Sequence, residues 1–277
     1  MQKKLGRNTV VLLGVGHTNA YFLRKWKMKP LENAELVCVS NFPTSTYSGM
    51  LPGVLSGQYS PEKMEIDLVR LCASAGVRLI LDEVVGVDPL EQRLLFRNRP
   101  SLAYDALSVG VGSVPTFGDV KIADRTPLIS VKPMQTFLSR LRERLQVFGG
   151  GGNTRIAVVG GGIGSIEIAL CLDQRIKTDP ASLGIEASKQ CQVSLVTGGN
   201  RVGAGLLEST RDKVDSHLQG RGIKAITGAR VAEVTSSGLV LKNGVIEEAD
   251  VVIWATSAVA PPILKALSLK AMSVDSY

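Results

Sequence analysis

The stretch RIAVVGGGIGSIEIAL at residues 155–170 restricts the fold of this chain more than any other. Residues 156–159 are apolar and mostly β-branched, as in a buried strand, and apolar residues return at helical spacing after Ile163. Three consecutive glycines at 160–162 lie between the two. A strand, a glycine turn and a helix in this order predict a Rossmann-type unit, in which the turn binds a dinucleotide.

The small residues follow the G-x-G-x-x-G pattern with one departure. Gly160 permits the tight turn, and Gly162 lets the backbone approach a pyrophosphate at the positive end of the helix. Ser165 takes the third position and is small enough for close packing of the helix on the strand. The alternative is a glycine turn in an α/β fold that binds no ligand.

A second copy of the pattern, TVVLLGVGHTNA, lies at residues 9–20. Gly14 and Gly16 take the first two glycine positions, and Asn19 takes the third. Alone this is a weak match, but two copies separated by about one domain's length of chain indicate two Rossmann-like units. The repeat predicts either two nucleotide sites, or one nucleotide site and one unit that keeps the pattern but no longer binds a nucleotide.

Neither copy has the acidic residue that usually follows the next strand and binds the ribose 2′-hydroxyl of NAD. Ser40 follows the strand expected at 35–39, where its hydroxyl can bind a ribose without charge, and Thr197 follows the strand expected at 192–196. Arg201 lies close behind and is either a ligand for the 2′-phosphate of NADPH or a solvated loop cation. NADPH therefore stays open beside NADH.

Residues 41–61 are rich in proline, glycine and hydroxyl side chains, which excludes a long helix. They include Tyr47, Met50 and Leu51, so the segment covers either a flat apolar ring system or its own core. Helices are expected at 62–75, after Lys132-Pro133 and at 209–222, and small antiparallel elements at 83–97 and 225–242. The expected fold class is α/β, with two Rossmann-like units that each combine a parallel sheet with a small antiparallel β element.

The composition excludes several classes of protein. Of 277 residues, 44% are hydrophobic and 21% are charged, so the chain can build proper cores. The net charge of +7 suits anionic ligands such as nucleotides and leaves peripheral contact with a membrane open. Nucleic acid is a poorer partner, because only 5% of residues are aromatic and no recognition motif surrounds the basic residues. No apolar run approaches a membrane span, and we expect a cytoplasmic protein.

The four cysteines are Cys38, Cys72, Cys171 and Cys191. No two have the C-x-x-C or C-x4-C spacing, which argues against a zinc site and against a redox disulfide beside a flavin. We expect buried, reduced thiols and no metal.

Four segments, in chain order GVGHTNA, YDALSVGVGSVP, VVGGGIGSIE and ADVVIWATSA, resemble the pyridine nucleotide-disulfide oxidoreductase superfamily. The resemblance covers nearly the whole chain and implies FAD in the first unit and NAD(P)H in the second. Without an active-site disulfide, and with the segment YSGMLPGVLSGQYSP, the chain resembles the type II NADH dehydrogenase-like branch, which favours NADH. More narrowly, it is similar to the flavoprotein domain fused ahead of selenide, water dikinase in some proteins.

The motif positions and the resemblance together give the candidate cofactor-binding residues, whereas the catalytic residues stay unknown. Those expected at FAD are Gly14, Gly16, His17, Asn19, Ser40, Met50, Leu51, Pro52, Val84 and Gly112. Those expected at NAD(P)H are Gly160, Gly162, Ile163, Gly164, Ser165, Glu167, Thr197, Arg201 and Ser257, with Lys132 as a further candidate. His17 is alternatively a polar residue at the start of a helix.

The resemblance also sets the expected domains. These are the first part of an FAD-binding domain at 1–118, a helix and glycine-rich linker at 119–152, an NAD(P)-binding domain at 153–262, and the start of a return to the FAD domain at 263–277. In the superfamily, the returning segment supplies a late Gly-Asp motif to the flavin, and this sequence has none. We therefore expect a C-terminally truncated chain that binds FAD weakly by itself.

Two functions remain open from the sequence. The first is an FAD-dependent NAD(P)H oxidoreductase that passes hydride from the nicotinamide to FAD and on to a quinone or another small electron acceptor. The second is a non-catalytic nucleotide-binding module, or a fragment of a larger fusion protein linked to selenophosphate synthesis. A homodimer is left open in either case.

Overall fold

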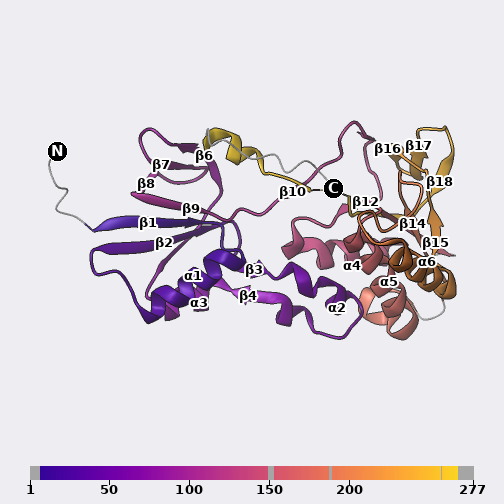
Figure 1. Ribbon diagram of the computed structural model, residues 1–277, viewed down its shortest axis with the longest axis horizontal. Helices are drawn as coiled ribbons and strands as arrows, with labels where there is room; N and C mark the ends of the chain where they lie inside the picture. Colours follow the sequence, from indigo (N-terminus) through magenta and orange to yellow (C-terminus); the bar gives the residue numbers. More distant parts are fainter. Residues whose placement is uncertain (1–6, 149–152, 187–188, 257, 268–277) are drawn as a thin grey trace. The chain divides into compact units, whose positions relative to one another are not determined.

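The computed structural model describes residues 7–148, 153–186, 189–256 and 258–267. They form two compact units, each assembled from separate stretches of chain (Figure 1). Of the described residues, the first unit contains 7–47, 64–114 and 260–267, and the second contains 48–63, 115–148, 153–186, 189–256 and 258–259. The second unit thus includes the segment 48–63, which the predicted boundaries assign to the first domain. The glycine-rich linker at 149–152, Ser257 and residues 268–277 lie outside the described residues.

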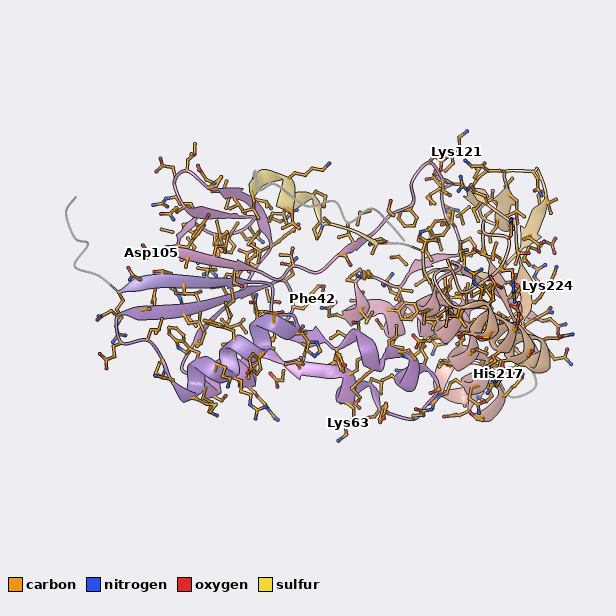
Figure 2. The ribbon with its side chains drawn as sticks, in the orientation of Figure 1. Phe42, Lys63, Asp105, Lys121, His217 and Lys224 are labelled. Atoms are coloured by element: carbon orange, nitrogen blue, oxygen red, sulfur yellow. The ribbon has the colours of Figure 1, made fainter. Side chains whose placement is uncertain are left out.

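The first unit is built on a four-stranded parallel sheet with the strand order β5-β2-β1-β9 (Figure 1). Its strands are β1 (Asn8–Leu13), β2 (Ala34–Ser40), β5 (Arg78–Leu81) and β9 (Ala106–Val109). At the start of β1, the backbone N–H of Thr9 donates to the carboxylate of Asp105 at 2.7 Å (Figure 2). This bond fixes the chain entering β9 beside β1.

Alternate residues along β1 point to opposite faces of this sheet. On one face, Leu12 packs with Leu23 and Trp26 of α1 (His17–Met28) and with α3 (Leu68–Ser74). On the other face, Val11 and Leu13 pack against a small antiparallel sheet and against η5 (Pro262–Leu267). That sheet consists of β6 (Val84–Asp88), β7 (Arg93–Phe96) and β8 (Leu102–Ala103). The residues after the second unit thus complete the core of the first.

The second unit repeats this plan around a five-stranded parallel sheet with the order β12-β19-β13-β14-β15. Its strands are β12 (Leu128–Ser130), β13 (Thr154–Val159), β14 (Cys191–Val196), β15 (Lys224–Ile226) and β19 (Val251–Trp254). Its helices, α4 (Phe137–Phe148), α5 (Ile163–Thr178) and α6 (Glu208–Arg221), contact these strands (Figure 1). Ala157 and Val159 face the other side, where the sheet of β11 (Lys121–Ile122), β16 (Val231–Thr235), β17 (Gly238–Leu241) and β18 (Ile246–Glu248) completes the core.

The expected α/β class with two parallel sheets, each accompanied by an antiparallel β element, is confirmed. The prediction of a helix over residues 62–75 is wrong for the first part of that range. Residues Pro61–Met64 form the 3-10 helix η2, and β4 (Glu65–Asp67) pairs antiparallel with β3 (Thr44–Thr46). The helix starts only at α3, because the carboxylate of Asp67 accepts a hydrogen bond from the N–H of Arg70 at 2.9 Å and caps it.

The segment 48–63 contains two short helical turns, η1 (Ser48–Met50) and α2 (Leu51–Leu55), and α2 packs on α5. It therefore has no long helix, as its glycines and prolines predict. The remaining short elements are β10 (Val114–Pro115), η3 (Met134–Thr136), η4 (Pro180–Leu183) and β20 (Ala258–Val259).

An ion pair joins two neighbouring strands of the second unit at the ends opposite the glycine turn. The backbone N–H of Arg155 donates to Oδ2 of Asp250 at 2.8 Å, and its Nη2 donates to Oδ1 at 3.0 Å. The hydrogen bonds from Arg155 hold the pKa of Asp250 below its ordinary value. This pair links the start of β13 to the residue before β19.

Candidate functional site

The turn after β13 requires glycine at its first position. Gly160 has a φ of +149°, and a Cβ there would lie 2.6 Å from the carbonyl oxygen of Ala255 and 3.0 Å from Cβ of Ser165. Ser165 is 1% exposed, and its hydroxyl donates to the carbonyl of Gly162 at 2.7 Å. The turn therefore lies against the end of β19, and the buried hydroxyl of Ser165 holds it in place through the carbonyl of Gly162.

The helix that follows the turn presents a free anion-binding end. Gly162 is the N-cap of α5, no side chain caps the helix, and its first turn contains no acidic residue. The first N–H groups of a helix have no partner within the helix, and the helix dipole makes that end positive. A Cβ at Gly162 or Gly164 would meet nothing within 4 Å. The open space and the uncapped N–H groups together suit a pyrophosphate.

This helix end opens into a cleft of about 760 Å³ within the second unit. Four of the candidates for NAD(P)H binding line it: Gly160, Gly162, Gly164 and Thr197. Thr197 is 6% exposed, and its Oγ1 accepts from the N–H of Gly199 at 3.2 Å. The volume lies in the range typical of small-molecule sites.

The cleft also has lining residues that the sequence motifs do not predict, among them Asp119, Arg230 and Trp254. Arg230 lies next to the end of β14 because two backbone hydrogen bonds connect the segments, Ala229 N–H to Thr197 O and Gly228 N–H to Gly199 O, both at 2.8 Å. Parallel neighbouring strands place residues beyond their carboxyl ends at one edge of a sheet. A prediction that β14 and β15 are neighbouring parallel strands would therefore have placed Arg230 at this edge.

Arg201 does not line this cleft. Its guanidinium donates to Glu208 at 2.6 Å, to Asp212 at 2.9 Å and to Asp215 at 2.6 and 3.1 Å. Hydrogen bonds to these carboxylates raise the pKa of Arg201 above its ordinary value. The arginine thus joins the loop after β14 to α6. This structural role differs from the two expected roles, which were a ligand for the 2′-phosphate and a solvated loop cation.

The other candidates of the second unit have varied surroundings. Ile163 is 52% exposed and Glu167 is exposed, and neither lines the cleft. Burial lowers the pKa of Lys132, which follows β12. In the 48–63 segment, Leu51 is buried, whereas Met50 and Pro52 are partly exposed. Ser257 lies outside the described residues, and the proximity of Met50, Leu51 and Pro52 to a flavin stays a prediction.

The turn after β1 has the same construction as the turn after β13. Gly14 has a φ of +75°, and a Cβ there would lie 2.5 Å from the carbonyl oxygen of Gly110. Asn19 is 2% exposed and has a supporting role, since its Nδ2 donates to Gly14 O at 2.6 Å and its Oδ1 accepts from Ser108 at 2.7 Å. Gly16 is the N-cap of α1, again with no capping side chain and no acid in the first turn.

Four more candidates belong to this first unit. His17 begins α1, and its ring contacts that of Tyr47 edge-on at 4.5 Å. The Ser40 hydroxyl donates to Phe42 O at 2.8 Å and accepts from Phe42 N–H at 3.2 Å, so a local turn already engages it. Val84 is the first residue of β6, and Gly112 has a φ of +69° with open space around it. Their contact with a cofactor stays a prediction.

The described residues contain four free cysteines, two of them buried. The thiols of Cys38 and Cys72 lie within hydrogen-bond reach of each other, and this contact together with burial raises the pKa of Cys38. Cys171 and Cys191 are partly exposed, so the expectation that the thiols are buried is wrong for these two. Over the same residues, no His, Cys, Asp or Glu side chains gather in a group of three or more that could hold a metal. Likewise, none of the helices described is long and apolar enough to cross a membrane.

Two Rossmann-like units, each with a glycine turn leading into an uncapped helix, define a protein of the class that binds two dinucleotides. Residues 8–274 match the pyridine nucleotide-disulphide oxidoreductase family, and the chain belongs to that family. Membership implies FAD and NAD(P)H as cofactors. The residues fit these groups, because both turns leave backbone N–H groups without side-chain caps and the second leaves space at Gly162 where a side chain would intrude.

Curated relatives include the demethylphylloquinone reductase NdbB of Synechocystis, 23% identical over 248 residues that cover 85% of this chain and 57% of the relative. An NADH dehydrogenase-like protein of Mycobacterium tuberculosis is 27% identical over 231 residues, which cover 76% of this chain and 54% of the relative. The chain thus spans little more than half the length of these relatives. The comparisons do not bear on the narrower resemblance to the flavoprotein fused to selenide, water dikinase, which stays a prediction.

Solved structures share the fold. The reduced CoADR-RHD protein of Bacillus anthracis superposes with a TM-score of 0.79 at 18% identity, covering 96% of this chain and 47% of that one. NDH2 of Plasmodium falciparum, solved with NADH, gives 0.75 at 17% identity, covering 94% of this chain and 57% of that one. At these identities the likeness extends to the fold alone.

Proposed function

We propose that this chain functions as an FAD-dependent NAD(P)H oxidoreductase, which moves hydride from a reduced nicotinamide to FAD and on to an acceptor. The observation that carries this proposal is the duplicated helix start. Gly16 and Gly162 are both N-caps without a capping side chain, and neither helix has an acid in its first turn. Natural helices usually satisfy these N–H groups with a polar side chain, so two open ends favour two anionic ligands.

The residues of each unit have separate tasks. The hydride chemistry is supplied by the flavin when it is bound. Gly14 and Gly160 let the chain turn sharply against Gly110 and Ala255, and the buried side chains of Asn19 and Ser165 hold the two turns in shape. This preorganisation keeps the backbone donors aimed at a pyrophosphate before the nucleotide arrives.

We further propose that the transfer proceeds without a redox-active disulfide. Cys38 and Cys72 are 0% and 1% exposed and pack in the core between β2 and α3, away from solvent. Burial at this level hinders thiol exchange with a substrate. The acceptor we propose is a quinone or another small molecule, a choice supported by the demethylphylloquinone reductase among the relatives.

Anaerobic titration tests this function. Purified protein reconstituted with FAD is mixed with NADH or NADPH, and loss of the oxidised flavin absorbance is recorded before and after addition of a soluble quinone. The proposal expects bleaching by the nicotinamide and recovery on addition of the quinone. Binding of both nucleotides without bleaching would instead support the non-catalytic nucleotide-binding module.

A further inference from the structure

We infer that the cleft of the second unit selects NADPH over NADH, with Arg230 as the residue that binds the 2′-phosphate. The inference rests on the proposed function, since it names the nucleotide that this site takes. In Rossmann units the adenosine ribose lies at the end of the strand that follows the glycine turn and its helix. In this chain that strand is β14, and Thr197, Gly198 and Gly199 at its end line the cleft.

The strand end carries no negative charge. Gly198 has no side chain, and the Thr197 hydroxyl is engaged by the N–H of Gly199. An NAD-specific site usually places a carboxylate here, which binds the ribose diol and repels a 2′-phosphate. Of the described residues that line the cleft, Asp119 is the one acid, and its carboxylate pairs with Nζ of Lys242 at 2.7 Å. A 2′-phosphate therefore meets no unpaired carboxylate from these lining residues.

A guanidinium takes the place of the missing acid. Arg230 is exposed and lines the cleft. A Cβ built on Gly198 would lie 3.4 Å from Cβ of Arg230 and 3.6 Å from its Nε, so the arginine side chain runs beside the strand end. Within the described part of the chain, no carboxylate lies within ion-pair distance of Arg230, in contrast to Arg201. The charge of Arg230 does contribute to lowering the pKa of Asp119, which lines the same cleft and pairs directly with Lys242.

The chemistry of the two groups matches. A phosphate monoester carries roughly −1.5 to −2 charges at pH 7, and a guanidinium binds such a group through two parallel N–H donors. The backbone bonds from Ala229 to Thr197 and from Gly228 to Gly199 fix the stem of Arg230 at this strand end. The backbone thus sets where the arginine side chain starts, beside the strand end.

Calorimetry with two nucleotide fragments tests the inference. Adenosine 2′,5′-bisphosphate and adenosine 5′-monophosphate are titrated into the purified chain, into Arg230→Ala and into Arg230→Gln. Lys224→Ala is the control, because it removes another cation of the same unit, on β15 (Figure 2). The Lys224 side chain is 63% exposed and does not line the cleft. Thermal melting of each variant checks the fold.

The inference expects the bisphosphate to bind at least about tenfold more tightly than the monophosphate, with the preference lost in both Arg230 variants and kept in Lys224→Ala. It also expects the preference to weaken as salt is raised, because the contact is exposed. Equal affinities in the wild type, or a preference that survives both Arg230 substitutions, would overturn it while leaving the proposed function intact. If neither fragment, NADH nor NADPH binds, the proposed function fails together with this inference.

Discussion

Replacing Gly162 by valine should impair nucleotide binding and leave the fold nearly unchanged. Gly162 has a φ of −84° and a ψ of 175°, an extended conformation that valine adopts readily. A Cβ there meets nothing within 4 Å, so the new side chain enters open cleft space and displaces no protein atom. The cost to folding is limited to a poorer helix N-cap, about 1 kcal/mol or less.

The cost to binding is larger, because the same space is where a pyrophosphate must approach the first N–H groups of α5. Each hydrogen bond to a charged group contributes roughly 1.5–3 kcal/mol. Loss of one or two such bonds amounts to about 1.5–6 kcal/mol, and since about 1.4 kcal/mol corresponds to a factor of ten, affinity should fall at least about tenfold.

Calorimetric titration of NADH and NADPH into wild type and Gly162→Val measures this loss, with flavin absorbance and thermal melting recorded in parallel. Gly220→Val is the matched control, because Gly220 also has nothing within 4 Å of its Cβ and lies in α6, outside the cleft. The control should retain full nucleotide affinity. Unchanged affinity in Gly162→Val, or equal loss of FAD and NAD(P)H, would refute a pyrophosphate site at this turn.

Three further substitutions test the supporting structure. Gly160→Ala should destabilise the second unit, because the added carbon meets the Ala255 carbonyl at 2.6 Å, and a lower melting temperature checks this. Asn19→Leu leaves the Gly14 carbonyl and the Ser108 hydroxyl without their partner and should lower the free energy of unfolding by about 2 kcal/mol in urea titrations. Asp250→Asn should cost about 1 kcal/mol at neutral pH. The folded pKa of Asp250 is lowered, so its contribution is present above the unfolded pKa of about 4 and is lost as the pH falls through the folded pKa. Wild type and variant should therefore begin to converge below about pH 4 in unfolding titrations.

The general plan of the fold could be predicted from local sequence, because each glycine turn lies between an apolar strand and an amphipathic helix that form from neighbouring residues. Gly14 and Gly160 are confirmed as glycine-only positions by their positive φ and by the carbonyls they approach. The region after Pro61 could not be predicted in this way. There, strand β4 forms because Thr44–Thr46 offers a distant pairing partner, and the Asp67 cap delays the helix.

The residues of the candidate site likewise separate into those that local sequence predicts and those that depend on distant strand pairing. The glycines and Thr197 follow from the motif, whereas Arg230 comes close to Gly198 only through the pairing of β14 with β15 and the backbone bonds beyond it. Arg201 illustrates the opposite error. Its distance along the chain from Thr197 is short, but the acidic residues of α6 face it and bind its guanidinium. Proximity in sequence was a poorer guide than the register of the sheet.

The stoichiometry of nucleotide binding tests the central claim, that this chain holds two separate dinucleotide sites, one in each unit. Equilibrium dialysis of the purified chain measures bound FAD and bound NAD(P)H, each alone and each in the presence of the other at saturation. The account predicts one FAD and one NAD(P)H per chain, with neither nucleotide displacing the other. Competition between FAD and NAD(P)H for a single site, with one nucleotide bound per chain in every mixture, would contradict it.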